Sequence, residues 1–108
     1  MKKKSSLELF NLTDKVIVLT GSAGRLGTNF AHILSDAGSN VVLVDIDDKN
    51  NNQLANSISK KYGTKPLTCN IDITKKDQLL QISKQILKKY GKIDGLVNNA
   101  FYSPRLNV

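Results

Sequence analysis

The feature that most constrains this chain is an apolar strand that leads directly into three glycines spaced three residues apart. Residues 16–27 read Val-Ile-Val-Leu-Thr-Gly-Ser-Ala-Gly-Arg-Leu-Gly. Gly21 permits a sharp turn off the strand, in a conformation that a Cβ would oppose. Gly24 lets the backbone approach a pyrophosphate, and Gly27 lets the next helix pack closely on the strand. Because the N–H groups at the start of that helix face the anion, the run predicts a phosphate-binding turn.

Glycine spacing alone indicates little, so the surrounding sequence decides the interpretation. A turn of this kind should follow a strand, open a helix and meet an acidic residue about twenty positions later. Five apolar residues follow helical spacing behind the turn: Leu26, Phe30, Ile33, Leu34 and Ala37. Gly38 is placed to end that helix, and a second apolar strand then leads into Asp45. All three conditions hold, whereas a tight turn without a ligand would need neither the third glycine nor the acid.

Hydrophobic periodicity predicts strands and helices that alternate along the chain. Strands are expected over residues 15–19, 40–44, 66–70 and 93–98. Helices are expected over 25–37, beyond a polar loop at 47–53, and beyond a capping box formed by Thr74 and Asp77. The later two helices should bury one apolar face each, made of Leu54, Ile58 and Tyr62 and of Leu79, Ile82, Ile86, Leu87 and Tyr90. The alternation implies an α/β fold, a parallel sheet with helices on both faces, and a nucleotide-binding topology would order its strands 3-2-1-4.

Composition narrows the classes of function. The net charge of +7 comes from lysines spread over the chain without interleaved aromatic residues, which argues against nucleic-acid binding. No apolar stretch is long enough to span a membrane, and the basic start lacks the apolar run of a signal peptide. The single cysteine, Cys69, falls in an apolar strand pattern and indicates a core residue in a reducing, cytoplasmic setting. The one histidine, His32, is expected on the solvated surface, and no metal-ligating cluster is expected.

Three motifs, in register with the expected strands, resemble the short-chain dehydrogenase/reductase family over residues 15–100. They are Thr-Gly-Ser-Ala-Gly-Arg-Leu-Gly at 20–27, Asp-Ile-Thr at 72–74 and Gly-Lys-Ile-Asp-Gly-Leu-Val-Asn-Asn-Ala at 91–100. Arg25 stands where the family's commonest pattern has its middle glycine, and this spacing looks like the extended, sugar-nucleotide-modifying branch. The third motif is similar to the NNAG signature of the ordinary branch, with Phe101 in place of the glycine. The mixture resembles ordinary-branch members from bacterial surface-sugar or flagellin-modification loci.

The resemblance implies a three-layer Rossmann-type fold that binds a dinucleotide. Residues 1–14 would form a leader, and residues 15–108 the N-terminal half of the cofactor domain, truncated after the fourth strand. Pyrophosphate and ribose would contact the turn residues Gly21, Ser22, Ala23, Gly24, Arg25 and Leu26. Asp45, followed by Ile46, would bind the adenosine ribose hydroxyls and repel a 2′-phosphate, which favours NAD over NADP. Asp72 and Ile73 would contact adenine, and Asn99 and Ala100 would pass beside the nicotinamide-side ribose.

Some of these residues could instead have a purely structural role. Asp45 could simply end a strand, and Asp72 could start the turn toward Thr74, a role compatible with binding. Asn98 or Asn99 could tie the fourth strand to the first near Thr20.

The family's chemistry comes from a serine after a fifth strand and a Tyr-x-x-x-Lys on the following helix, and this sequence carries neither. Tyr62, Tyr90 and Tyr102 have no lysine four residues later. We therefore expect a fragment of an oxidoreductase, or a truncated product, whose homo-oligomeric parent moves a hydride to or from a small, sugar-derived substrate. The alternative is a non-catalytic nucleotide-binding module. In either case the apolar strand at 93–98 would form an exposed edge.

Overall fold

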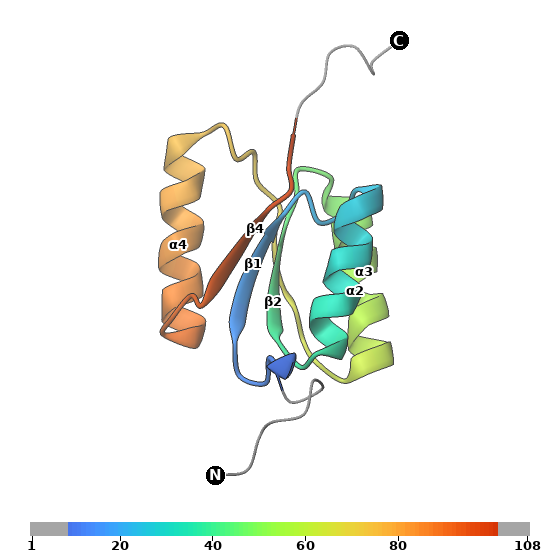
Figure 1. The fold of residues 1–108 in the computed structure, drawn as a ribbon. Helices are drawn as coiled ribbons and strands as arrows, with labels where there is room; N and C mark the ends of the chain where they lie inside the picture. The colour runs from blue at the N-terminus through green and yellow to red at the C-terminus, as the bar shows by residue number, and fades with distance from the viewer. Residues whose placement is uncertain (1–8, 102–108) are drawn as a thin grey trace.

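A computed structural model describes residues 9–101, which form a parallel sheet flanked by helices on both faces (Figure 1). The strands are β1 (Val16–Thr20), β2 (Asn40–Val44), β3 (Leu67–Cys69) and β4 (Gly95–Asn98), and the helices are α2 (Arg25–Asp36), α3 (Asp48–Tyr62) and α4 (Lys76–Tyr90). The strand order is β3-β2-β1-β4, with every pairing parallel. The order and the class of fold expected from the sequence are confirmed.

The strand register brings the carboxyl ends of the central strands to one edge of the sheet. Thr20 at the end of β1 pairs with Val44 of β2 on one side and with Asn98 of β4 on the other. β1 and β2 are almost entirely buried, as parallel strands covered on both faces must be. The segments that follow these strands therefore meet at one edge, and the glycine turn is among them.

Helix α2 begins at Arg25 as expected, and its inward face agrees only in part with the apolar spacing: Phe30 and Leu34 pack against the core as predicted, but other expected positions do not. The buried positions are Gly27, Ala31 and Ser35, whereas Leu26 and Ile33 are exposed. A Cβ on Gly27 would overlap the carbonyl oxygen of Gly21, so the helix must present residue 27 to the turn. This contact fixes the rotation of α2 and carries Leu26 and Ile33 outward.

Helix α3 begins earlier than the sequence suggested. The polar segment 47–53, expected as a loop, is mostly helical from Asp48 onward. The Asp47 side chain accepts the N–H of Asn50 and so caps the helix. The expected inward face is confirmed for Leu54 and Ile58, which are buried.

Helix α4 begins at Lys76, and the capping box expected from Thr74 and Asp77 does not form. The residue before the helix, Lys75, makes no side-chain cap. The Thr74 hydroxyl and N–H donate instead to Asp72 Oδ1, and Lys75 rather than Thr74 occupies the N-cap position. The apolar face of α4 is only partly as expected: Ile82 and Ile86 are buried, while Leu79 and Leu87 remain substantially exposed.

Helix α4 covers one face of the sheet and helices α2 and α3 cover the other (Figure 1), and a hydrophobic cluster lies on each side. On the side of α2 and α3, the cluster contains Leu19, Val41, Leu43, Leu54 and Ile58 with Ala31. On the side of α4, it contains Val16, Val18, Val42, Val44, Cys69, Ile82 and Ile86. Burial raises the pKa of the Cys69 thiol, and the core position expected for this residue is confirmed. None of the helices in residues 9–101 has the length and hydropathy needed to cross a bilayer.

Candidate functional site

The carboxyl edge of the sheet borders an open groove of about 1090 Å³. The groove is lined by most of the predicted site residues, namely Gly21, Gly24, Arg25, Leu26, Asp45, Ile46, Asp72, Ile73, Asn99 and Ala100. It is also lined by residues that the sequence did not single out as site residues: Asn29, Val44, Ile71, Thr74 and Phe101. Segments far apart in the sequence thus converge on one site, at the place where parallel α/β sheets bind ligands.

The glycine turn is built as the spacing predicted at two of its three positions. Gly21 has a φ of +67°, and a Cβ on it would meet the Ala100 Cα at 2.9 Å. Gly27 touches the turn itself, as described above. Gly24 has a φ of −75°, and a Cβ there would approach nothing closer than 3.4 Å. The chain's own packing therefore requires Gly21 and Gly27, whereas the role of Gly24 toward an anion stays a prediction.

The start of α2 is open toward the groove. Its N-cap residue, Gly24, makes no side-chain cap, and the first turn contains no acidic residue. Helix α3, by contrast, is capped by Asp47 and carries Asp48 in its first turn. An uncapped helix start presents N–H groups and the positive end of the helix dipole, which favour an anion.

Asp45 is fixed beside the glycine turn. Its Oδ2 accepts the N–H of Ala23 at 2.9 Å, and its Oδ1 accepts the N–H of Asp47 at 2.9 Å. The carboxylate therefore closes the turn and also lines the groove. Because each carboxylate oxygen has two lone pairs, both remain able to accept a further hydrogen bond.

Ser22 and Ala23, which belong to the predicted binding turn, do not line the groove. Ser22 is fully buried, its hydroxyl donates to Asn51 Oδ1 at 2.6 Å, and its N–H donates to the carbonyl of Val44 at 3.3 Å. The N–H of Ala23 is held by Asp45. Both N–H groups are thus paired within the protein, and these two residues shape the turn from behind.

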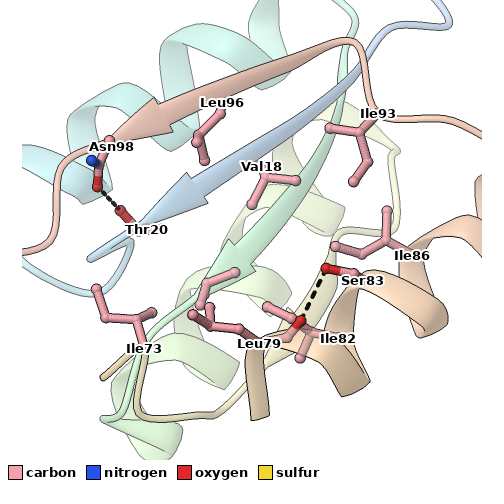
Figure 2. Close-up of a pocket in the computed structure, with 11 residues that line it drawn as sticks. Val18, Thr20, Ile73, Leu79, Ile82, Ser83, Ile86, Ile93, Leu96 and Asn98 are labelled. Atoms are coloured by element: carbon pink, nitrogen blue, oxygen red, sulfur yellow. Dashed lines mark hydrogen bonds between the residues drawn. The ribbon is translucent and has the colours of Figure 1, made fainter. Parts of the chain in front are cut away.

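The tie between β4 and β1 near Thr20 is present. The Thr20 hydroxyl accepts the N–H groups of Asn99 (3.0 Å) and Ala100 (3.1 Å) and donates to Asn98 Oδ1 at 3.3 Å (Figure 2). The Asn99 side chain also donates to the carbonyl of Gly21 at 3.2 Å. These bonds fix the segment after β4 against the glycine turn and confirm a structural role for both asparagines.

Asp72 starts a turn at the far side of the groove. Its Oδ1 accepts the Thr74 hydroxyl at 2.6 Å and the Thr74 N–H at 2.9 Å, and these hydrogen bonds lower the pKa of the Asp72 carboxyl. The N–H of Asp72 donates to Gln78 Oε1 at 2.9 Å. The structural reading of Asp72 is therefore confirmed, and its contact with adenine stays a prediction.

Two side chains that the sequence placed in a loop or on the surface have defined partners. Asn51 is fully buried, and its position three before Leu54 and seven before Ile58 was the signal for this. His32 is half-buried rather than freely solvated, with Nδ1 3.1 Å from the Tyr62 hydroxyl. That contact joins α2 to α3.

A second hollow, of about 360 Å³, lies between α4 and the sheet (Figure 2). Its walls are mostly apolar and include Val18, Ile82, Ile86 and Leu96. Leu96 is 64% exposed on β4, which within the described residues is the outermost strand on that side. The exposed apolar edge expected for this strand is present.

Comparison with known proteins identifies the family. The model of the family described as short chain dehydrogenase matches residues 15–106. The chain belongs to this family. An NAD-dependent glycerol dehydrogenase from Listeria innocua is 40% identical over 91 residues, which cover 84% of this chain and 34% of that protein. The chain thus spans about a third of the length of this curated relative.

Solved structures of dehydrogenases and reductases have the same fold. A hydroxysteroid dehydrogenase from Escherichia coli matches with a TM-score of 0.80 and 31% identity, covering 86% of this chain and 39% of that one. An L-sorbose reductase from Gluconobacter frateurii, solved with NADPH and L-sorbose, matches with a TM-score of 0.82 and 27% identity. The match covers 86% of this chain and 35% of the reductase. The similar proteins thus include one described as NAD-dependent and one solved with NADPH.

Proposed function

We propose that this chain is the cofactor-binding part of an NAD-dependent oxidoreductase. The observation that carries the proposal is Asp45, whose carboxylate lines the groove and is hydrogen-bonded to the glycine turn. A carboxylate so placed accepts the 2′- and 3′-hydroxyls of a ribose and repels a 2′-phosphate. The glycerol dehydrogenase relative, described as NAD-dependent, adds support.

The residues of the groove fit a dinucleotide. The uncapped start of α2 offers N–H groups to a pyrophosphate, and Gly24 leaves the space in front of them free of a side chain. Arg25 lines the same groove and adds a positive charge for the phosphates. Ile73 supplies an apolar wall for adenine, and Ala100, held by Thr20, borders the nicotinamide-side ribose. The bound cofactor would supply the hydride chemistry, and these residues would hold and orient it.

The substrate of the parent enzyme is proposed to be a small polyol or sugar-derived alcohol or carbonyl. Relatives named for glycerol and L-sorbose support this class. We place the parent in the cytoplasm as a homo-oligomer, and the buried free thiol of Cys69 is in keeping with a reducing compartment.

Cofactor titration tests the proposal more directly than turnover does. The chain lacks the family's Tyr-x-x-x-Lys, and loss of general acid–base catalysis costs about 10²–10⁴-fold in rate. We therefore expect no NADH formation from glycerol or other alcohols above a heat-denatured control. Turnover above that control would place catalytic groups among these residues and overturn this assignment.

Calorimetric titration of the 108-residue chain should give tighter binding of NAD than of NADP. Asp45→Asn keeps a near-isosteric side chain but removes the charge, so the difference should shrink while NAD binding largely persists. Asp45→Ala also releases the N–H of Ala23, and should weaken both cofactors as well. Asp36→Asn, on an exposed residue at the other end of α2, is the charge-matched control and should leave both affinities unchanged. Equal affinities for NAD and NADP in the unmodified chain would contradict the proposal.

A further inference from the structure

A buried polar network lies directly behind the glycine turn, and Asn51 of α3 is its centre. The Asn51 side chain is fully buried. Its Oδ1 accepts the Ser22 hydroxyl at 2.6 Å, and its Nδ2 donates to the carbonyl of Leu43 at 3.0 Å and to Asn70 Oδ1 at 3.0 Å. A backbone carbonyl can only accept, so the amide orientation is fixed by Leu43. Asn51 thus uses both N–H donors and its carbonyl oxygen within the protein.

The three partners of Asn51 belong to the segments that supply the groove. Ser22 lies in the glycine turn between Gly21 and Gly24, Leu43 lies two residues before Asp45, and Asn70 lies two residues before Asp72. Gly21, Gly24, Asp45 and Asp72 all line the groove, whereas Asn51 and Ser22 do not. One side chain therefore links the ends of β1, β2 and β3 at the edge where the ligand would bind.

We propose that Asn51 is a positioning residue for this site. By holding the Ser22 hydroxyl, it keeps the glycine turn in the conformation that presents Gly24 and the start of α2 to a dinucleotide pyrophosphate. The effect on cofactor affinity rests on the proposed function, whereas the effect on the turn does not. A pre-ordered turn spares the ligand the cost of ordering it on binding.

Ser39 provides a matched comparison for Ser22. Both serines are fully buried, and each donates one hydroxyl hydrogen bond, at 2.6 Å for Ser22 and at 2.7 Å from Ser39 to the carbonyl of Leu34. Ser39 directly precedes β2, at the opposite end of the sheet from the groove. Loss of either hydroxyl removes a similar buried bond, but only Ser22 adjoins the binding turn.

The test compares Ser22→Ala, Asn51→Leu and Ser39→Ala in the 108-residue chain. Amide hydrogen exchange followed by NMR reports the opening of Ala23 and Gly24, and the Val42 amide in the central strand β2 reports global unfolding. In Ser22→Ala, exchange at Ala23 and Gly24 should rise about tenfold beyond any change at Val42, the size expected for one buried hydrogen bond. Ser39→Ala should show no such excess. If Asn51→Leu does not fold, the comparison of turn exchange in Ser22→Ala and Ser39→Ala still tests the proposal.

The affinity for NAD, measured by calorimetry, separates the two proposals. If the unmodified chain binds NAD, its Kd should rise about tenfold in Ser22→Ala and stay unchanged in Ser39→Ala. If the unmodified chain binds no NAD but Ser22→Ala still shows excess exchange in the turn, the result would support the positioning role and count against the proposed function. Turn exchange in Ser22→Ala that matches Ser39→Ala, or an unchanged Kd in a chain that binds NAD, would overturn the role of Asn51.

Discussion

The two ends of the parallel sheet use the same kinds of residues for different purposes. At the carboxyl end, the left-handed Gly21 and the buried Ser22 shape a turn that borders a groove of about 1090 Å³. At the amino end, the left-handed Gly38 and the buried Ser39 join α2 to β2, and a Cβ on Gly38 would meet Thr13 Oγ1 at 2.9 Å. Gly38 and Ser39 pack within the protein, whereas at the carboxyl end Gly21 lines the groove and the buried Ser22 supports the turn from behind.

Two carboxylates extend the comparison. Asp45 accepts the N–H of Ala23 at the groove, and Asp94 accepts the N–H of Val16 at the other end of β1, at 2.8 Å. Asp94 also pairs with Lys92 at 3.1 Å, so its charge is compensated by the protein. The two carboxylates differ in position more than in type: Asp45 lies at the carboxyl edge, where parallel sheets bind ligands, and Asp94 lies at the opposite end.

The largest expected effect comes from the left-handed glycines at the two ends of the sheet, Gly21 and Gly38. Gly21→Val should abolish dinucleotide binding, because a branched side chain opposes the positive φ and would collide with Ala100. Gly38→Val should lower the free energy of unfolding by about 1–2 kcal/mol or more through its own backbone strain. The folded fraction of Gly38→Val should still bind NAD. Calorimetric titration and urea unfolding separate the two outcomes.

Circular dichroism must accompany the glycine variants, because only a folded Gly21→Val chain is informative. Lys60→Ala, on an exposed residue late in α3, serves as a neutral control for both measurements. A folded Gly21→Val chain that binds NAD as well as its parent would refute the phosphate-binding turn and, with it, the difference between the two ends.

The next effect concerns the two carboxylates. Asp45→Arg should reverse the cofactor preference, since a guanidinium attracts the 2′-phosphate that a carboxylate repels. Asp94→Asn should leave the ratio of NAD to NADP affinity unchanged, because Asp94 lies at the amino end of β1. Competition between the two cofactors in a fluorescence titration measures that ratio. If the ratio of NAD to NADP affinity changed in Asp94→Asn and not in Asp45→Arg, the cofactor would bind at the amino end of the sheet rather than the carboxyl end.

Local patterns in the sequence predicted the strands and the glycine turn with Asp45, while the remaining predicted groove residues followed from the resemblance to a known family. Apolar runs identify β1 and β2, and the motif around the glycines locates Gly21, Gly24 and Asp45 at one edge. The strands and the glycine turn depend on residues close together in the chain, and their meeting at one edge follows from the parallel arrangement of the strands. Cofactor contacts themselves stay predictions.

Features that depend on contacts between distant segments were not predictable in this way. The rotation of α2 follows from the contact of Gly27 with the turn, which apolar spacing does not contain. The start of α3 was missed because an asparagine-rich segment favours loops, whereas burial of Asn51 against Ser22 and Leu43 holds it helical. Asn51 itself could have been found from its spacing to Leu54, but its partners could not.

The smallest expected effect is a dependence of stability on pH that the two ends share. Hydrogen bonds from Thr74 lower the pKa of Asp72 at the groove, and at the amino end the Val16 N–H, followed by Lys92, lowers the pKa of Asp94. For a carboxyl whose folded pKa lies below its ordinary value of 3.8, the stabilisation is complete well above pH 3.8 and is lost as the pH falls through the lowered value.

Urea unfolding at pH 5 and pH 3 should therefore show a drop in stability that Asp94→Asn and Asp72→Asn each reduce. Asp94→Asn should do so without changing NAD affinity, because its partners lie at the amino end. Asp72→Asn should also weaken NAD binding modestly, because Asp72 and Ile73 line the groove. If both variants changed the acid sensitivity and neither changed the affinity, Asp72 would belong with Asp94 as a purely structural carboxylate, and the binding edge would end at β2.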